Sequence, residues 1–288
     1  MHIILRRPKL GRTSCKEIAK FMESTDARRC DWPKFRKLFT KPQIPGYLFR
    51  WGCTANIPDG YAVVNTSEAI HQVNDKTSFR VTLDDAELCP PTWFSLIEFT
   101  NNLDGRAKYP VIVRPKKHAQ GKMLFLCNNY DELVVACNRC GAGYYISEYI
   151  PKVAEYRVAI VSGRAVWVAK KTPADPAAIA WNVARGGRFD NVSWGDWPLK
   201  VVKIAIEGFN LSKLDFGGVD VMVDAEGKCY ILEINSAPSL TSPYRQECMG
   251  KAFQYIIANG KDRIPLIEAK GGYLKFIHPA VAADAKLI

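Results

Sequence analysis

Residues 217–239, which read GGVDVMVDAEGKCYILEINSAPS, restrict the fold more than any other part of the chain. Two runs rich in Val, Ile and Leu flank the turn-forming stretch 224–227, Asp-Ala-Glu-Gly. Apolar runs of this length on either side of a glycine-containing turn are typical of two antiparallel strands. The segment therefore predicts a β-hairpin near the carboxyl end of the chain.

The pleat of this hairpin predicts two very different faces, because side chains alternate along a strand with a period of two. If Val223 pairs with Lys228, Asp220 lies opposite Ile231. One face is then apolar and suited to a core: Val219, Val221, Val223, Tyr230, Leu232 and Ile234. The other face carries Asp220, Glu233 and Asn235.

The three polar residues of the second face form a candidate metal site. Diagonal neighbours on antiparallel strands lie about 7–8 Å apart, so Asp220 and Glu233 can converge on one ion. Oxygen-only ligands of this kind suit Mg²⁺ carried by nucleotide phosphates. The alternative is an ordinary hairpin with a polar outer face, which seldom gathers two carboxylates and an amide on one side.

Length and composition favour a globular protein with more than one subdomain. The chain has 288 residues, of which 48% are hydrophobic and 24% charged, so it can hold two or three subdomains with a proper core. No apolar run approaches the length of a membrane span, and the stretch MHIILRRPKLGR is too short in apolar residues for a signal peptide. Nine scattered cysteines favour free thiols in a reducing cytoplasm, and the single pair Cys137 and Cys140 is a weak zinc signal.

Positive charge is concentrated at the start of the chain. The net charge is +11, and residues 1–50 hold 13 Lys and Arg against 4 Asp and Glu. Aromatic residues lie among these charges, at Trp32, Phe35 and Phe39 for example. A basic, aromatic-rich lobe attracts polyanions, so nucleic acid is a possible partner, although no recognised nucleic-acid motif accompanies the charge. A solvated surface that collects ATP or an acidic acceptor is the alternative.

Local patterns predict alternating strands and helices along most of the chain. Ser14 and Glu17 form a capping box for a first helix, Asp196 is expected to cap another, and residues 31–46 are predicted to be irregular. The predicted strands are 3–5, 47–51, 61–64, 109–114, 123–127, 144–150, 156–161 and 164–170, and the further helices are 67–75, 131–140, 196–210 and 243–258.

Three blocks in this order resemble the ATP-grasp superfamily, and within it the RimK-type ribosomal-protein glutamate ligases. They read SEYIPKVAEYRVAIVSGRAV, WNVARGG and GGVDVMVD…KCYILEINSAPSL, and the match covers about residues 72–258. RWG at 50–52, followed by VNTSEAIHQVNDK, is similar to small ATP-grasp proteins encoded by bacteriophages.

The resemblance implies an α+β fold in which two lobes clamp ATP behind a small basic N-terminal lobe. The implied division is 1–72 for the N-terminal lobe, 73–145 for the first ATP-grasp lobe with its phosphate loop, 146–260 for the second lobe with the adenine hinge and Mg²⁺ site, and 261–288 for a C-terminal tail.

The same resemblance implies which residues bind ATP. Lys76 and Arg114 match the two phosphate-contacting cations, and Gly121 and Lys122 belong to the loop 116–122 that stands in for the flexible lid, which holds a single glycine. Glu148, Tyr149 and Ile150 resemble the hinge that holds adenine through backbone groups. Glu155 matches the acidic residue that accepts the ribose hydroxyls.

The residues implied to face the reacting groups are Arg157, Asn182 and Arg185, with Lys170 and Lys171 as further cations. Fixed cations at these positions stabilise the charge that develops during phosphoryl transfer. Asp220, Glu233 and Asn235 are implied to hold one or two Mg²⁺, with Mn²⁺ as an alternative metal.

The function implied is that of a cytoplasmic ATP-dependent ligase, located in the host cytoplasm if a bacteriophage encodes it. A carboxylate attacks the γ-phosphate, and an amine then displaces phosphate from the acyl phosphate to form an amide. The alternatives are an ATP-grasp phosphotransferase and a non-catalytic module that binds ATP or nucleic acid. The expected partners are small-molecule or peptide carboxylates and amines, whose identity the sequence leaves open together with the oligomeric state.

Overall fold

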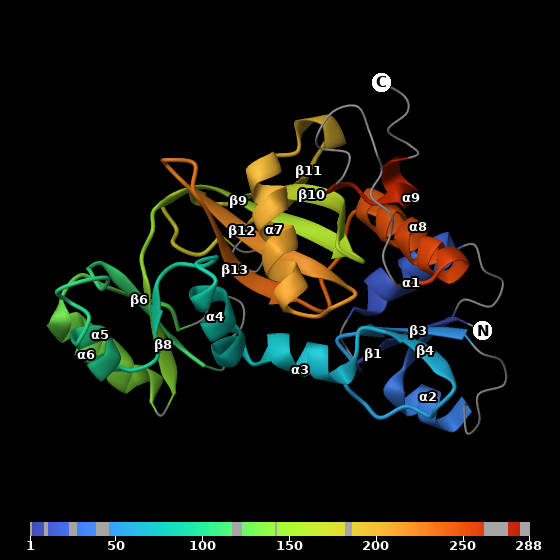
Figure 1. The fold of residues 1–288 in the computed structure, drawn as a ribbon, viewed down its shortest axis with the longest axis horizontal. Helices are drawn as coiled ribbons and strands as arrows, with labels where there is room; N and C mark the ends of the chain where they lie inside the picture. The colour runs from blue at the N-terminus through green and yellow to red at the C-terminus, as the bar shows by residue number, and fades with distance from the viewer. Residues whose placement is uncertain are drawn as a thin grey trace.

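Three β-sheets follow one another along the chain and are joined by helices (Figure 1). The computed structural model describes residues 2–8, 11–22, 28–38, 46–116, 123–141, 143–181, 186–261 and 276–282. The mixture of one parallel and two largely antiparallel sheets with packed helices is an α+β fold, as predicted.

The first sheet is parallel, with the strand order β2-β1-β3-β4. Its strands are β1 (Ile3–Arg6), β2 (Arg28–Asp31), β3 (Gly46–Trp51) and β4 (Tyr61–Val64), and its helices are α1 (Arg12–Phe21) and α2 (Trp32–Leu38). The prediction that residues 31–46 are irregular is wrong for residues 31–38. Trp32 and Phe35 stack at 5.6 Å between ring centroids, and this aromatic contact fixes the short helix α2.

The second sheet forms a separate lobe with the order β5-β8-β6-β7. Its elements are β5 (Thr92–Trp93), α5 (Leu96–Thr100), β6 (Val111–Pro115), β7 (Phe125–Cys127), α6 (Tyr130–Cys140) and β8 (Tyr144–Glu148). Two helices, α3 (Ser67–Asn74) and α4 (Lys76–Asp85), connect the first sheet to this lobe (Figure 1). Asp75 ends α3 and caps α4 by accepting hydrogen bonds from Thr77 and Ser78.

The third sheet is antiparallel and carries the predicted hairpin, with the order β11-β10-β9-β12-β13. Its strands are β9 (Lys152–Val161), β10 (Arg164–Thr172), β11 (Arg188–Val192), β12 (Phe216–Asp224) and β13 (Cys229–Asn235). Helix α7 (Leu199–Leu211) lies between β11 and β12, and α8 (Pro243–Asn259) and α9 (Pro279–Ala282) follow β13. A short 3₁₀ turn, η2 (Trp194–Asp196), precedes α7, so Asp196 does not cap this helix as predicted; Pro198 stands at the cap position.

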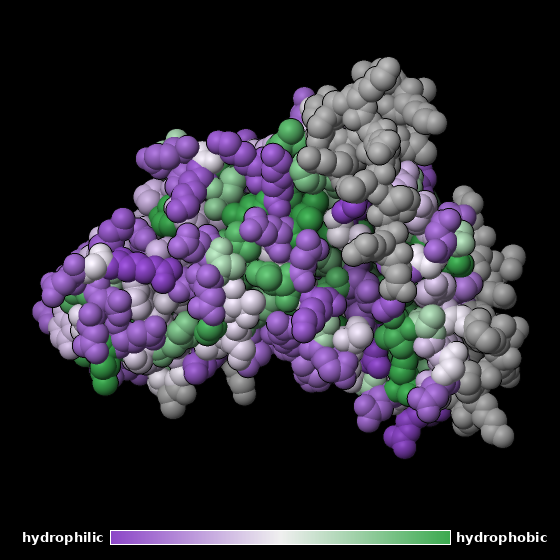
Figure 2. Space-filling view, viewed as in Figure 1, coloured by the Kyte–Doolittle hydropathy of each residue, from purple (hydrophilic) through white to green (hydrophobic). Residues whose placement is uncertain are grey.

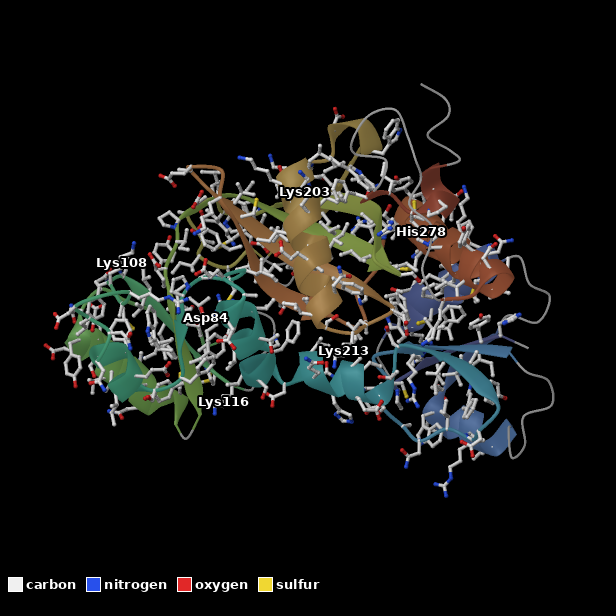
Figure 3. All side chains as sticks on the ribbon, in the orientation of Figure 1. Asp84, Lys108, Lys116, Lys203, Lys213 and His278 are labelled. Atoms are coloured by element: carbon white, nitrogen blue, oxygen red, sulfur yellow. The ribbon has the colours of Figure 1, made fainter. Side chains whose placement is uncertain are left out.

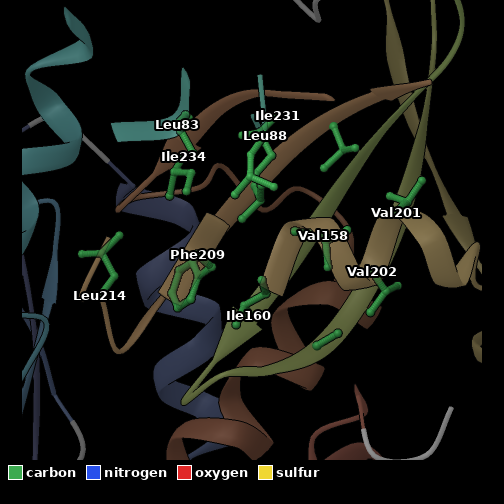
Figure 4. Packing of buried hydrophobic residues seen from close by; sticks show 14 of the residues in the cluster. Leu83, Leu88, Val158, Ile160, Val201, Val202, Phe209, Leu214, Ile231 and Ile234 are labelled. Atoms are coloured by element: carbon green, nitrogen blue, oxygen red, sulfur yellow. The ribbon is translucent and has the colours of Figure 1, made fainter. Parts of the chain in front are cut away.

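Two hydrophobic clusters cover the two faces of the third sheet. One contains Val158, Ile160 and Ile231 from the strands, Phe209 from α7 and Leu83 from α4 (Figure 4). The second packs α8 and α1 on the opposite face and brings in Trp51 from β3. The second sheet has its own cluster around Phe99.

Ser14 shows how α1 is joined to the segment between β13 and α8. The helix begins at Arg12, so Ser14 lies inside the helix and the predicted capping box is wrong. Its buried hydroxyl donates to the carbonyl oxygen of Leu240 at 3.2 Å and accepts from the N–H of Leu240 at 3.0 Å. A side chain that resembles a helix cap in the sequence therefore makes a tertiary contact.

Hydrophilic residues dominate the face of the molecule shown in Figure 2, and the hydrophobic residues there lie in small groups. Among the described residues, every helix is too short or too polar to traverse a lipid bilayer.

Candidate active site

The hairpin of β12 and β13 contains a β-bulge that sets the geometry of the site. Val223 pairs with Cys229 and Asp220 pairs with Glu233, so the predicted pairings of Val223 with Lys228 and of Asp220 with Ile231 are wrong. The register shifts between Asp220 and Val221, where β13 carries one extra residue.

The bulge changes which side chains of β13 face the core. Ile231 packs in the core opposite Val221, whereas the prediction put Tyr230 and Leu232 on the core face of β13. Leu232 and Glu233 both line a cavity on the other face. Arg80 of α4 supports this arrangement, because its guanidinium donates to the carbonyl oxygens of Ile231 at 3.3 Å and of Leu232 at 2.9 Å. These bonds satisfy backbone acceptors at the outer edge of the sheet.

Arg157 and Asp220 form a buried, bidentate ion pair. They lie directly opposite each other on the neighbouring strands β9 and β12. The Nε of Arg157 is 2.5 Å from Oδ1 of Asp220, and Nη2 is 2.7 Å from Oδ2. Burial opposes the charged form of Arg157, but the Asp220 carboxylate outweighs burial and raises its pKa. The guanidinium is therefore a fixed, charged group beside Asp220, and Asp220 itself lines the cavity described below.

Glu155 lies one row further along β9 and binds two lysines. Its carboxylate accepts hydrogen bonds from Lys152 and from Lys171, and all three side chains are largely buried. Lys171 also lies 3.7 Å from Asp220, which joins the two ion pairs into one network. Of the two lysines named from the sequence, Lys171 lines the cavity, whereas Lys170 is exposed on the other face of β10, because side chains alternate along a strand.

Glu233 receives its cation from a different part of the chain. Lys76, at the start of α4, lies 3.1 Å from Oε2 of Glu233, and the amide of Asn235 donates to Oε1 at 3.0 Å. Burial opposes ionisation, but Lys76, the Asn235 amide and Arg157 together lower the pKa of Glu233 to about 2. Glu233 is therefore a carboxylate at every physiological pH.

The carboxylates of this network and two of its lysines line one wall of a cavity of about 350 Å³ between the second and third sheets. Ile112, Met222 and Leu232 give it an apolar part, and Arg80, Arg114, Lys152, Glu155, Lys171, Asp220 and Glu233 give it a charged part. Such a volume, with a few convergent polar groups, suits a ligand of the size of a nucleotide.

The segment Glu148, Tyr149 and Ile150 crosses one end of this cavity. The N–H of Glu148 donates to Pro91 and that of Tyr149 to Pro110, whereas the N–H of Ile150 has no backbone acceptor among the described residues. The carboxylate of Glu148 lies 3.0 Å from Lys108, which Figure 3 labels on the second lobe. A backbone N–H beside apolar side chains is suited to a flat heterocycle with an acceptor edge.

Arg114 brings a further cation to the junction of the lobes. It lies on β6, lines the cavity, and also lines an adjoining recess with Lys76 and Glu233. The Nε of Arg114 is buried without a hydrogen-bond partner among the described residues. A cation with an unused donor in this position can accept an anionic ligand.

Of the predicted metal ligands, Asp220 pairs directly with Glu233, and Asn235 lies two positions further along β13, opposite Gly218. Their carboxylate and amide oxygens are donors that Mg²⁺ accepts. Each carboxylate is bound by a cation, and the described residues contain no group of three His, Cys, Asp or Glu side chains poised around one point. The oxygen donors fit the metal, which would replace Lys76 beside Glu233.

Four predicted residues, Gly121, Lys122, Asn182 and Arg185, lie outside the described part of the chain. The structure adds Arg80 and Lys152, which sequence reasoning missed, to the cavity wall. Lys152 lies three residues before Glu155 and next to the predicted adenine hinge, so its place in the site could have been predicted from the sequence. Arg80 sits in the unpredicted helix α4 and gave no signal.

Comparison with known proteins gives a consistent result. The RimK-like ATP-grasp domain family matches residues 95–256, which is more than half of the chain. A D-alanine–D-alanine ligase of Fusobacterium nucleatum is 30% identical over 146 residues, covering 46% of this chain and 48% of that protein. The chain thus spans about half the length of this curated relative.

Solved structures share the fold at low sequence identity. The D-alanine–D-alanine ligase of Bacillus anthracis in complex with ATP superposes with a TM-score of 0.63 at 14% identity, covering 90% of this chain and 96% of that one. The ATP-grasp ligase PsnB, in complex with a minimal precursor, Mg and ADP, gives a TM-score of 0.62 at 12% identity, covering 88% and 98%.

Proposed function

The chain belongs to the RimK-like ATP-grasp family, and on this premise we propose that it is an ATP-dependent carboxylate–amine ligase that forms an amide through an acyl phosphate. The observation that carries the proposal is the ion-pair network beside the cavity, where Arg157, Lys171 and Lys76 bind Asp220 and Glu233, two carboxylates of the cavity lining. Phosphoryl transfer needs fixed cations and little covalent help from a protein, and this network supplies them.

ATP fits the cavity in one direction. Adenine lies against Ile150, with Met222 and Leu232 as apolar neighbours, and Glu155 accepts hydrogen bonds from the ribose. The triphosphate then runs toward Lys76 and Arg114 and the carboxylates. Asp220, Glu233 and Asn235 would hold one or two Mg²⁺, which neutralise phosphate charge when bound.

The chain's residues position the reacting groups. A carboxylate oxygen of the substrate attacks the γ-phosphorus, the bond to the β-phosphate oxygen breaks, and ADP leaves. Arg157, held by Asp220, faces the negative charge that spreads over the transferred phosphoryl group. The amine then attacks the acyl carbon, phosphate leaves and the amine loses a proton. Asn182 and Arg185 are proposed to contribute to the same steps.

The substrates proposed are a small-molecule or peptide carboxylate and an amine. The relatives support both kinds of substrate, since one is named for joining two alanines and another was solved with a minimal precursor. The eight cysteines whose side chains are described are free thiols, which supports a cytoplasmic location. The basic residues of the first lobe are proposed to attract an acidic substrate.

Glu233→Gln tests the proposal. The amide keeps the size of the side chain but removes the charge, so we expect ADP release to fall by roughly 100-fold or more, with thermal unfolding close to that of the wild type. Glu226→Gln, an exposed change in the turn of the same hairpin, is the matched control. ADP release by Glu233→Gln equal to that of the wild type would falsify the site assignment.

Product analysis tests the reaction type. A ligase releases inorganic phosphate when carboxylate and amine are both present, and hydroxylamine in place of the amine gives a hydroxamate. Phosphate that stays on the product would instead identify a phosphotransferase. Nucleotide binding without turnover would identify a binding module.

A further inference from the structure

One face of the third sheet leads from the cavity directly to the start of α8. Three rows of residues follow one another on this face. Lys171 lies opposite Phe189 in the first row, Arg157 lies opposite Asp220 in the second, and Gly218 lies opposite Asn235 in the third. Helix α8 packs over the following positions of the same face and lies at the end of the sheet remote from the second lobe (Figure 1). A group in the first turn of α8 therefore borders the charged wall on the side away from the adenine hinge.

Arg245 occupies this place and is only 5% exposed. Its guanidinium lies 5.6 Å from the ring centroid of Trp167 and 5.7 Å from that of Phe189. Arg157 lies over the same Phe189 ring at 4.7 Å, so the two guanidinium groups flank one aromatic side chain. Arg245 thus adjoins the proposed reaction centre.

Arg245 forms no salt bridge with any described residue. Among the described residues no carboxylate lies within 4.0 Å of it, and its protein contact is Nη2 donating to the carbonyl oxygen of Phe189 at 3.3 Å. Its Nε is buried without a hydrogen-bond partner in the described part of the chain. The carboxylate of Asp190 acts on Arg245 only from a greater distance, and it is itself bound by Arg188 and Thr172.

This lack of compensation separates Arg245 from the other buried cations of the face, because Arg157 is bound by Asp220 and Lys171 by Glu155. Burial and the nearby charge of Arg157 lower the pKa of Arg245, yet an arginine remains charged at neutral pH. The N-terminus of the 17-residue helix α8 adds partial positive charge, and Ser242 makes no side-chain cap there. A buried, unpaired guanidinium is costly unless an anion binds to it.

We propose that Arg245 binds a second carboxylate of the acyl substrate, so that the enzyme prefers a dicarboxylic acid or an acidic amino acid to a monocarboxylic acid. The inference rests on the proposed ligase function and deepens it. The fork of a guanidinium accepts both oxygens of one carboxylate, which fixes the orientation of the substrate while its other carboxylate meets the γ-phosphate.

The test compares glutarate and L-glutamate with butyrate, each with Mg-ATP and hydroxylamine, by hydroxamate formation and ADP release. We expect Arg245→Met to lower kcat/KM for glutarate by about 10- to 100-fold, the usual range for a hydrogen-bonded charge pair, and to leave that for butyrate and the affinity for Mg-AMPPNP unchanged. Arg245→Lys keeps the charge without the fork and should fall between Met and the wild type. Arg139→Met, an exposed arginine on α6 of the second lobe, is the control and should behave as the wild type.

Each other outcome is decisive. If Arg245→Met and Arg245→Lys lower kcat/KM for butyrate and glutarate by the same factor, or change neither, the inference is overturned while the ligase function stands. If the wild type gives neither ADP nor hydroxamate with any of the three acids, the proposed ligase function fails and the inference fails with it.

Discussion

The acids and the cations of the site come from different parts of the chain, and this separation decides what the sequence reveals. Asp220 and Glu233 were predicted because both lie in one hairpin. Their cations, Arg157 and Lys76, lie 63 and 157 residues away, respectively. Local pattern places a side chain on a face, but only the tertiary fold decides which ion pairs form across strands. The resemblance to a family, and not the residue pattern, named these two cations.

His278 is a second residue whose state depends on its tertiary environment. It is fully buried near α8 and α9 (Figure 3), and its Nδ1 accepts a hydrogen bond from the N–H of Ala280 at 3.1 Å. Its ring meets that of Tyr255 edge-on at 5.3 Å. Burial, with a contribution from Arg164, lowers the pKa of His278 to about 3.

This shift makes the stability of the fold depend on pH. The pKa of His278 is about 3 in the folded state and 6.5 for an unperturbed histidine, so the unfolded state binds more protons between these values. The free energy of unfolding should therefore be largest above pH 6.5 and fall as the pH drops toward 3. We expect His278→Asn, which keeps an acceptor but does not titrate, to reduce the fall in unfolding temperature between pH 7 and pH 5. Equal slopes for the variant and the wild type would contradict this account.

At the scale of elements, the hairpin shows how far periodicity reaches. The alternation of side chains predicted the strands β12 and β13 and the shared face of Asp220, Glu233 and Asn235. It could not predict the bulge, because the extra residue is stabilised from outside the hairpin. Arg80 binds the carbonyl oxygens at the bulge, and the N–H of Ile231 donates to the carbonyl of Leu88 at 2.7 Å.

Short elements were missed for a related reason. Helix α2 spans seven residues and strand β5 two, too few to show a period. Tertiary contacts hold them instead, since Phe35 of α2 packs against Tyr61 and Thr92 of β5 pairs with Ser147. Longer elements such as α6, predicted at 131–140 and observed as Tyr130–Cys140, carry enough pattern to be predicted alone.

The packing of α1 against α8 supplies a prediction at this scale. A Cβ built on Gly250 of α8 would overlap Cβ of Phe21 and lie 3.2 Å from the carbonyl oxygen of Ile18, so the helices touch through backbone. Gly250→Ala should destabilise the protein by about 1–3 kcal/mol through overpacking, although alanine favours a helix. The free energy of unfolding in urea measures the loss. Gly195→Ala, where an added Cβ meets nothing within 4 Å, is the control, and an equal or higher stability of Gly250→Ala would refute close packing.

At the scale of the whole molecule, one hydrophobic cluster joins two of the three sheets, and the remaining sheet has a cluster of its own. Residues of the first sheet, such as Phe49 and Trp51, share a cluster with Phe216 and with Phe253 of α8. The cluster around Phe99 draws its described members from residues 93–146 alone. The first and third sheets therefore form one packed body, and the second lobe stands on its own core.

This division predicts two unfolding events. Phe99 is fully buried and meets Trp93 edge-on at 5.1 Å and Tyr109 at 5.3 Å. Phe99→Ala should destabilise the second lobe by about 3–5 kcal/mol and leave the rest folded, so that protection from amide hydrogen exchange falls in residues 93–146 and persists in α8. Phe253→Ala, in the shared cluster, is the counterpart and should reduce protection in the first and third sheets. A uniform loss of protection throughout the chain with Phe99→Ala would show a single cooperative unit.

The link between Ser14 and Leu240 has a consequence for the newly made protein. These partners are separated by 226 positions, and α1 completes its packing only against α8. A ribosome makes about 5–20 residues per second, so the N-terminal segment waits many seconds with apolar side chains uncovered before its partner emerges. During translation α1 is thus made long before the segments that complete its packing, and it is the helix that a chaperone would have to shield.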